Sequence, residues 1–448
     1  MVIPLLVYHT LLHTGLCLSD AEMDLLFVHV IWRHGDRSPL RTFPSDPIQE
    51  DFWKFGGGGF GELSPLGMKQ HYNLGKQIRR RYVDTKFLSK RYSAREIYVR
   101  SSDFNRTINS AMSNLIGMYG FNHNDSVKGV DYPDVKGWPD GYVPIAVHTI
   151  PRGIDYLLAS PTCRRRNTLR KIMQESEEAR SYITSPPIVE LFKNLSVYCD
   201  EDVNANNVWS IRDVLMVEQI HASDTLRIKN KWFSDKLFEK ITEVDKRIEL
   251  YKQANFSRPV MFNDLDVWQE YQKVRGGSLL NEIDMRMKMK LDCQKEHLFG
   301  LQRCKWINHL KYYAYSGHDA NIISFFAIFK LLESKLIMPD GYVPYAAAIF
   351  VELWMNRTEG KPYFKLCYHR SPNSPSSTNT IYTITPEIEA CAGKVYCKLD
   401  VFENISAVVR PNQEMHKWCL VDPNFAVTSW LLQPMTAFIF LWVDWVCF

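Results

Sequence analysis

Residues 25–39 read LLFVHVIWRHGDRSP, and this stretch decides the fold of the 448-residue chain. The first eight residues are apolar apart from His29 and rich in β-branched and aromatic side chains, which predicts a buried strand. Residues 33–39 then form a polar loop where the strand ends. Ligands bind beyond the carboxyl ends of strands in open α/β sheets, so this loop is the first candidate for a functional site.

Strands and helices alternate on both sides of this stretch. Ser64-Pro65 is typical of a helix start, and the helix is expected to run to about Tyr82. Further strands are predicted at 96–100, 312–316, 346–354 and 363–368, with a helix carrying Arg106 between the first two. The pattern predicts an α/β fold with a mainly parallel sheet flanked by helices. Residues 131–300 are expected to form a mostly helical cap, inserted into a domain made of 22–130 and 301–425.

The residue types in the 33–39 loop suit phosphate chemistry. A neutral imidazole such as that of His34 is a good nucleophile, and Arg33 and Arg37 offer forked donors to phosphoryl oxygens. Gly35 lets the backbone turn tightly beside the nucleophile. The pattern R-H-G-x-R-x-P should arise by chance in a chain of this length about once in 10⁴ cases. The alternative is a surface loop with a satisfied histidine.

Four segments carry a resemblance to a known family. They are RHGDRSPLRTFPSDPI from residue 33, GELSPLGMKQHYNLGKQIRRRY from 61, YVRSSDFNRTINSAMSNL from 98 and YSGHDANI from 315. In order and spacing they resemble the histidine acid phosphatases, the branch of the histidine phosphatase superfamily that includes the prostatic and lysosomal enzymes. The resemblance covers most of residues 24–425 and implies a phosphoglycerate mutase-like sheet with a helical cap.

The resemblance also implies a role for each matched residue. His34 matches the nucleophile that forms a phosphohistidine, and Asp319 matches the general acid. The matched phosphate-binding residues are Arg33, Arg37, Arg106 and His318. The expected substrate is a small phosphomonoester, with no cofactor and no metal. The family often has H-D-T-T where this chain has His318-Asp319-Ala320-Asn321, so the resemblance leaves the catalytic rate and the substrate preference open. Asn105-Arg106-Thr107 is a formal sequon that we expect to stay unused.

Export features agree with this resemblance. Residues 1–20 are expected to be a signal peptide, with a buried first helix as the alternative. Sequons predict glycans at Asn124, Asn194, Asn255, Asn356 and Asn404. The resemblance suggests the disulfides Cys163–Cys419 and Cys391–Cys397. Cys293 and Cys304 are 11 positions apart and could close a local loop. The family's partner region for Cys199 has no cysteine here, so Cys199–Cys367 is left by elimination.

The other predictions concern partners and location. Residues 427–448 are nearly all apolar and fit a membrane span, a GPI-attachment signal or an element packed on the body. A net charge of +4 without a large basic cluster argues against a nucleic-acid partner. The oligomeric state is open, with a homodimer as one expectation. The protein is expected in the secretory pathway, outside the cell, at its surface or in the lysosome.

Three functions follow from these patterns. The first is an acid phosphatase with broad activity on phosphomonoesters. The second is a phosphatase specialised for inositol phosphates or lysophospholipids, since the cap shapes the pocket. The third is a catalytically silent secreted binding protein or antigen on the same fold, which the intact set of matched catalytic residues argues against.

Overall fold

The computed structural model describes residues 20–120, 125–159, 161–295, 300–339, 341–370 and 381–423. Most of the expected signal peptide and all of the apolar tail at 427–448 lie outside these ranges. Across the described ranges, no helix is long and apolar enough to cross a membrane. The same ranges contain an eight-stranded sheet in the order β10-β8-β7-β1-β6-β2-β3, with β9 paired to β8.

The strand β1 (Met23–Arg33) lies in the middle of this sheet and divides it into two halves. On one side β6 (Tyr312–Gly317), β2 (Ile97–Ser102) and β3 (His148–Ile150) continue parallel to it. On the other side the pairs are antiparallel, through β7 (Ala348–Asn356), β8 (Lys361–His369), β9 (Tyr382–Thr383) and β10 (Cys397–Lys398). The predicted α/β class and the strands predicted at 346–354 and 363–368 are confirmed, and the parallel pairing is confined to one half of the sheet.

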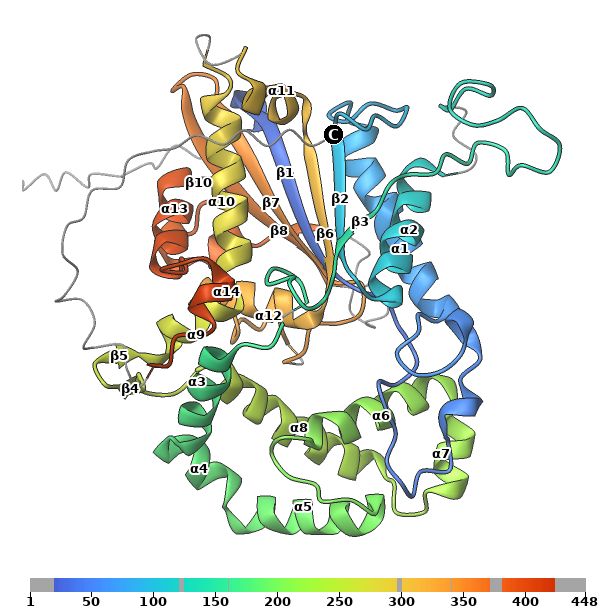
Figure 1. The fold of residues 1–448 in the computed structure, drawn as a ribbon, viewed down its shortest axis with the longest axis vertical. Helices are drawn as coiled ribbons and strands as arrows, with labels where there is room; N and C mark the ends of the chain where they lie inside the picture. The colour runs from blue at the N-terminus through green and yellow to red at the C-terminus, as the bar shows by residue number, and fades with distance from the viewer. Residues whose placement is uncertain are drawn as a thin grey trace, which may run out of the picture.

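Helices cover the central strands on both faces (Figure 1). Val28, Val30 and Trp32 of β1 pack against α1 (Pro65–Ile78) and α2 (Asn105–Tyr119). Phe27 and Ile31 face the opposite layer, which contains α10 (Gly277–Asp292), α12 (Asp319–Ile328) and α13 (Leu399–Val408). Burial on both faces explains why β1 reads as a nearly continuous apolar run.

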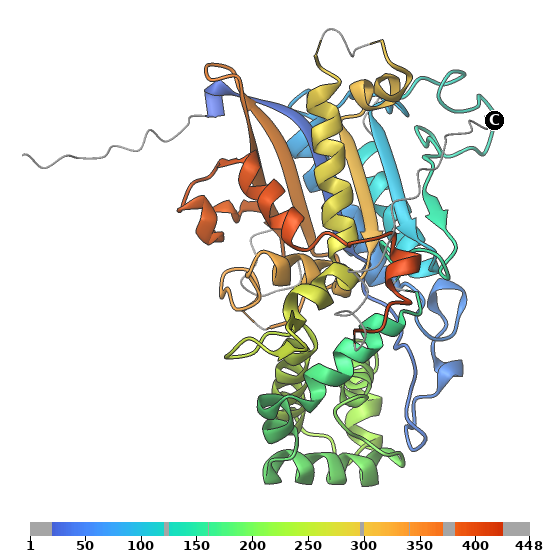
Figure 2. The same ribbon diagram turned by 60° about the vertical axis from the view of Figure 1, so that its left-hand side comes forward.

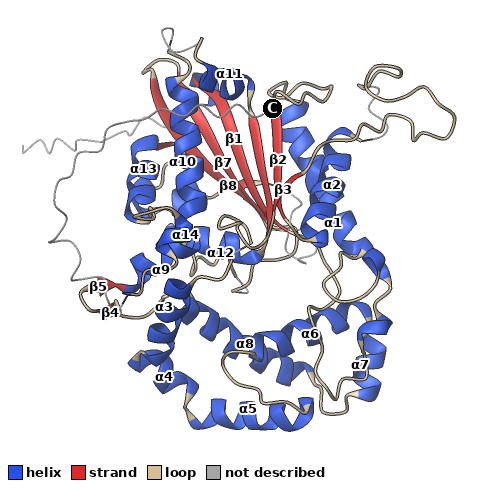
Figure 3. Cartoon of the chain, in the orientation of Figure 1, coloured by secondary structure: helices blue, strands red, loops and turns tan. Residues whose placement is uncertain are grey.

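A helical cap lies beyond the carboxyl ends of the parallel strands, at the bottom of Figure 3, where helices are joined by loops. Its helices are α3 (Arg164–Glu175), α4 (Glu177–Ile183), α5 (Pro186–Cys199), α6 (Val208–His221), α7 (Ser223–Lys229) and α8 (Asp235–Lys252). The cap has its own apolar cluster, which also takes in Phe43 from the segment after the 33–39 loop. The cap is therefore anchored on the chain that leads away from the candidate site.

The cap is shorter than the 131–300 predicted from the sequence. At one boundary β3 adds to the sheet, and at the other α10 runs along the sheet, as Figure 2 shows. The hairpin β4 (Met261–Phe262) with β5 (Leu265–Asp266) and helix α9 (Val267–Arg275) lead from cap to sheet. Helices α11 (Gln302–His309) and α14 (Met415–Trp418) complete the described chain. The amphipathic pattern of α10 predicts that this helix packs on an apolar surface, but it does not say whether that surface belongs to the cap or to the sheet.

Three of the four expected disulfides are present: Cys163–Cys419, Cys293–Cys304 and Cys391–Cys397. The pairing of Cys199 with Cys367 is wrong, because both are buried free thiols in different apolar clusters. Cys199 belongs to the cap and Cys367 to β8. The inference by elimination failed because an unpaired cysteine also fits a hydrophobic core, where it behaves as a small apolar residue.

One of the predicted glycan sites conflicts with the fold. Asn356 is 1 % exposed, and its Oδ1 accepts the backbone N–H groups of Thr358 and Glu359, both at 2.8 Å. It shapes the β7–β8 turn and leaves no room for a sugar. Asn194 and Asn404 are exposed and Asn255 is half-buried, so glycans there stay predictions, while Asn124 lies outside the described residues.

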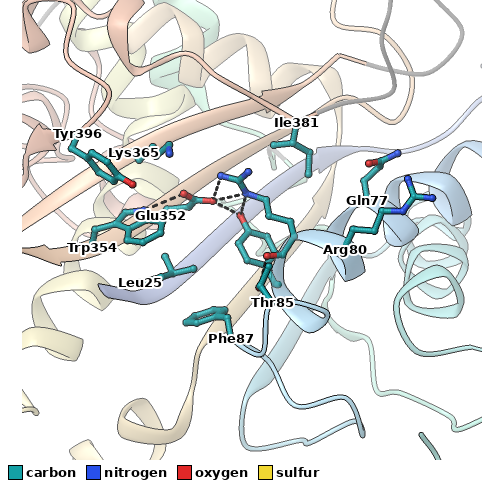
Figure 4. A pocket seen from close by; sticks show the side chains of 12 residues that line it. Leu25, Gln77, Arg80, Thr85, Phe87, Glu352, Trp354, Lys365, Ile381 and Tyr396 are labelled. Atoms are coloured by element: carbon teal, nitrogen blue, oxygen red, sulfur yellow. Dashed lines mark hydrogen bonds and ion pairs between the residues drawn. The ribbon is translucent and has the colours of Figure 1, made fainter. Parts of the chain in front are cut away.

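A cavity of about 580 Å³ lies at the end of the sheet where β1 begins (Figure 4). Its floor is the fully buried carboxylate of Glu352 on β7. That carboxylate accepts from Arg81 Nε at 2.8 Å, Tyr82 OH at 2.5 Å and Trp354 Nε1 at 3.0 Å. The network ties the end of α1 to the antiparallel half of the sheet.

Candidate active site

The candidate residues come from the ends of adjacent parallel strands. Strand register pairs Trp32 with Ser316 and Arg33 with Gly317, so the residues that follow β1 and β6 emerge together. The backbone N–H of His34 donates to the carbonyl of Gly317 at 3.0 Å. The imidazole rings of His34 and His318 have centroids 5.5 Å apart. The two motifs, far apart in sequence, therefore meet as the family resemblance implies.

Gly35 fits the loop against the start of α1. A Cβ on Gly35 would lie 2.5 Å from the carbonyl oxygen of Gly67, and a Cβ on Gly67 would lie 2.2 Å from that of Asp36. Gly35 is absent from the residues with positive φ. The sequence argument assigned it a tight turn, and the structure shows that close backbone packing is the reason for glycine instead.

His34 is held in the neutral form that a nucleophile needs. Its pKa lies well below 6.5 because the ring is buried and because Arg106, Arg33 and Arg37 add positive charge around it. Its Nδ1 lies 2.8 Å from the Gly35 carbonyl oxygen, which can only accept a hydrogen bond. The proton of the neutral ring is thus on Nδ1, and the Nε2 lone pair is free for attack.

The three predicted arginines surround the His34 ring, and different contacts hold each guanidinium group. Arg33 donates from Nη1 to the Val343 carbonyl at 2.6 Å, and its guanidinium lies 4.1 Å from the Tyr345 ring. Arg37 is held by Asp213. Arg106 stacks over Phe104, and its pKa falls to about 10 because of burial and the neighbouring Arg37.

The Nε atoms of all three arginines are buried and have no hydrogen-bond partner in the described part of the chain. The same is true of Arg100, Arg165 and Arg212, so the Nε atoms by themselves do not single out this site. The convergence of three guanidinium groups on one imidazole is what indicates a place for an oxyanion.

His318 is positioned by residues on both sides. Its Nε2 lies 3.0 Å from the hydroxyl oxygen of Ser102 at the end of β2. Its backbone N–H donates to Asn321 Oδ1 at 2.8 Å, and Asn321 Nδ2 donates to the carbonyl of Leu157 at 3.3 Å. The departure from H-D-T-T thus places an amide that fixes the start of α12. Burial and Arg106 lower the pKa of His318 to about 3.

Asp319 lies at the first position of α12 and faces the cleft. Its Oδ2 is 3.2 Å from Arg33 Nη2, and its side chain is 45 % exposed. Burial alone would raise the pKa of this carboxyl, but Arg33 and His318 outweigh it and lower the pKa below the ordinary value. A general acid must be protonated, so in this state Asp319 is poised as a base.

Two neighbours of these arginines were not found by sequence reasoning. Asp213 on α6 binds Arg37, and Tyr345 places its ring 5.8 Å from that of His34. Asp213 had a weak signal, since it is an acidic residue within the apolar run VWSIRDVLM. Tyr345 had none, because a tyrosine before a strand is ordinary.

The site opens into a cleft of about 730 Å³ between sheet and cap. One part of its lining is apolar and includes Leu66, Trp209 and Met216. Another part is charged and contains Arg170, Arg212, Asp245, Glu249, Lys252 and Arg275. The cleft thus offers both apolar and ionic contacts to a leaving group. Among the described residues, no group of three or more His, Cys, Asp or Glu side chains is placed to hold a metal ion.

Comparison with known proteins agrees with this geometry. The family model described as "Histidine phosphatase superfamily (branch 2)" matches residues 24–369. The chain belongs to that family. This histidine phosphatase is 33 % identical over 412 residues to a Caenorhabditis elegans protein with a provisional acid phosphatase name, covering 90 % of this chain and 96 % of that one.

Vertebrate relatives and solved structures extend the comparison. The prostatic acid phosphatase of Bos taurus is 32 % identical over 355 residues, covering 78 % of each chain. The human lysosomal acid phosphatase is 31 % identical over 337 residues, covering 74 % of this chain and 67 % of that one. A Hafnia alvei phytase shares the fold with a TM-score of 0.60 at 15 % identity, covering 90 % of this chain and 99 % of that chain. The family resemblance seen in the sequence is confirmed.

Proposed function

We propose that this protein is an acid phosphatase that hydrolyses phosphate monoesters through a phosphohistidine on His34. The observation that carries the proposal is a neutral imidazole with a free Nε2, enclosed by Arg33, Arg37 and Arg106. Guanidinium groups in a site of low dielectric stabilise the charge that develops on a transferring phosphoryl group. The names of the relatives support the same activity.

The reaction takes place in two displacements. His34 Nε2 attacks phosphorus, the ester P–O bond breaks, and Asp319 gives a proton to the leaving oxygen. Water then attacks the phosphohistidine and gives its proton to Asp319, and the P–N bond breaks with its electron pair returning to Nε2. His318 and the arginines bind the remaining phosphoryl oxygens in both steps.

Substrate binding supplies the proton affinity that Asp319 lacks in the free protein. A phosphate dianion contacting Arg33 competes with the carboxylate for the same guanidinium and adds negative charge beside it. Both effects raise the pKa of Asp319. The ion pair at 3.2 Å therefore marks the free state, and its loosening accompanies substrate binding.

The test is release of phosphate from a simple aryl phosphate in mild acid with excess chelator. Wild type should turn over, and His34→Ala should lose activity by a factor of at least about 10³. His416→Ala, at an exposed position in α14, is the matched control and should match wild type. Folded wild type without turnover would reject the proposal in favour of the silent binding protein.

A second candidate is a substrate with additional phosphates, such as an inositol phosphate. The cationic part of the cleft lining, Arg170, Arg212, Lys252 and Arg275, favours it. The apolar part favours an aryl or lysophospholipid leaving group. Comparing kcat/KM for an aryl phosphate, a lysophosphatidate and an inositol phosphate at two salt concentrations separates them, because cationic contacts weaken with salt.

The proposed location is the secretory pathway. Three disulfides in a chain of this size suit an oxidising compartment. Membrane attachment through the apolar tail and a homodimer stay predictions. Phase partitioning of the full chain and its sedimentation would check them.

A further inference from the structure

The cap helix α6 binds the nucleophile loop itself. The Asp213 carboxylate accepts from Arg37 Nη1 at 3.0 Å and Nη2 at 2.9 Å, and its Oδ2 also accepts from the backbone N–H of Leu40 at 3.4 Å. Arg37 is 4 % exposed and Asp213 7 %. The pair is therefore a buried, two-pronged ion pair between cap and loop.

The same helix holds the neighbouring loop residue at a second point. His221 lies eight residues further along α6, about 12 Å at the rise of a helix. Its Nε2 is 2.5 Å from Asp36 Oδ1, which also accepts from Ser64 Oγ at 2.5 Å. Two successive loop residues are thus fixed by one cap helix. The cap is part of the support of the phosphate site as well as a wall of the cleft.

The pairing fixes the direction in which Arg37 can bind phosphate. A two-pronged carboxylate contact places the guanidinium and the carboxylate in one plane. Both Nη atoms are then turned toward Asp213, Nη1 also donates to the Ser38 carbonyl at 3.0 Å, and Nε points along a fixed direction. Without Asp213 the guanidinium would rotate about its long side chain, and a misplacement of about 1 Å in such a contact can cost about 10²-fold in rate.

The pairing also limits the charge that the site presents. Asp213 neutralises one of three arginines around His34, so the free site attracts a phosphate dianion less strongly than three unpaired guanidiniums would. Inorganic phosphate is the last product of the proposed reaction. Strong binding of it would slow turnover without helping the transition state.

We propose that Asp213 is a positioning residue that orients Arg37 for phosphoryl transfer and keeps product phosphate from binding too tightly. This inference rests on the proposed function. It assigns to the cap a part in catalysis that neither the motif nor the comparisons describe. Loss of orientation lowers kcat, and loss of the Asp213 charge strengthens the binding of phosphate, so the proposal predicts slower turnover together with tighter product binding.

The test is Asp213→Asn, assayed with an aryl phosphate for kcat and KM and with inorganic phosphate as inhibitor. The expected result is a fall in kcat of about 10–10²-fold, with a lower inhibition constant of phosphate. An unchanged inhibition constant overturns the part of the proposal that concerns product binding. Asp213→Glu keeps the charge but moves the carboxylate by one methylene. It should recover part of the lost kcat and a wild-type inhibition constant.

Glu270→Gln is the matched control for lost stability. Glu270 pairs with Arg165 at 2.5 Å in a buried contact that is not part of the cleft lining, so kcat should stay within about 3-fold of wild type. An unchanged kcat in Asp213→Asn overturns the proposal, as does a phosphate inhibition constant that rises with the loss of kcat. If Asp213→Asn does not fold, a kcat of Asp213→Glu equal to wild type overturns it. Inactive wild type would instead reject the proposed function.

Discussion

Replacing Asp319 by asparagine separates an observed contact of this carboxylate from its proposed role. The structure pairs it with Arg33 at 3.2 Å, and the proposed mechanism makes it the proton donor to the leaving oxygen. The ion pair matters equally for every substrate. Proton transfer matters most for a poor leaving group, because an alkoxide needs a proton as the bond breaks and a nitrophenolate does not.

The magnitudes of the two effects differ enough to be told apart. The Asp319 side chain is 45 % exposed, so its ion pair is screened by water and is worth at most about 1 kcal/mol, or about five-fold in rate. General acid catalysis contributes about 10²–10⁴-fold. We expect Asp319→Asn to change kcat/KM by no more than about five-fold in either direction for nitrophenyl phosphate, and to lower it by about 10²-fold or more for an alkyl phosphate.

The assay is kcat/KM for the two esters, since this constant reports the steps up to the first irreversible one and so excludes hydrolysis of the phosphohistidine. Burst kinetics with nitrophenyl phosphate then report the second step, where the same residue is the base. An equal loss of kcat/KM for both esters would refute the assignment of Asp319 as proton donor. It would leave only its contact with Arg33.

Further predictions concern charge, stability and surface chemistry. Because burial and cationic neighbours lower the pKa of His34 well below its usual value, histidine NMR should show its ring neutral where an ordinary histidine is already protonated, and a titration near pH 6.5 would contradict this. Glu352→Gln removes the negative charge from the buried contacts of Figure 4, so the free energy of unfolding measured in urea should fall by about 1–3 kcal/mol while kcat stays unchanged. An unshifted urea midpoint would show that the charge of Glu352 does not stabilise the fold. Cys163→Ser should cost about 2–5 kcal/mol in unfolding free energy under oxidising conditions, and equal stability would show that the bridge is dispensable. Peptide mapping should find no glycan at Asn356, in contrast to exposed Asn404, and a glycosylated Asn356 would contradict its burial.

Features set by local sequence were predicted well. The apolar run at 25–32 became β1, and Ser64-Pro65 starts α1, where the Ser64 hydroxyl accepts from the Gly67 N–H at 3.0 Å. Each depends on residues a few positions apart, and the underlying preferences are backbone geometry and burial. The meeting of His34 with His318 needed only the rule that parallel strands end at one edge, together with the family pattern.

Features set by contacts between distant segments were not predicted. Asp213 and Arg37 are 176 positions apart, and nothing in either neighbourhood encodes the other. Helix α10 packs on the sheet although its sequence resembles that of the cap helices. Strand β3 has only three residues, too few for a pattern of burial to show. These choices depend on which surfaces remain after the rest of the chain has folded.

The Cys163–Cys419 bridge sets a problem of timing during synthesis. Cys163 leaves the ribosome 256 residues before its partner, and at about 5–20 residues per second this delay is about 10–50 s. Cys199 is the next cysteine along the chain and competes for Cys163 during most of the delay. In the folded cap Cys199 is the last residue of α5, and its thiol is buried in the apolar cluster of the cap, where it cannot react. Early folding of the cap would therefore protect the correct pairing, and a slow-folding cap would make the yield of native protein depend on a disulfide isomerase.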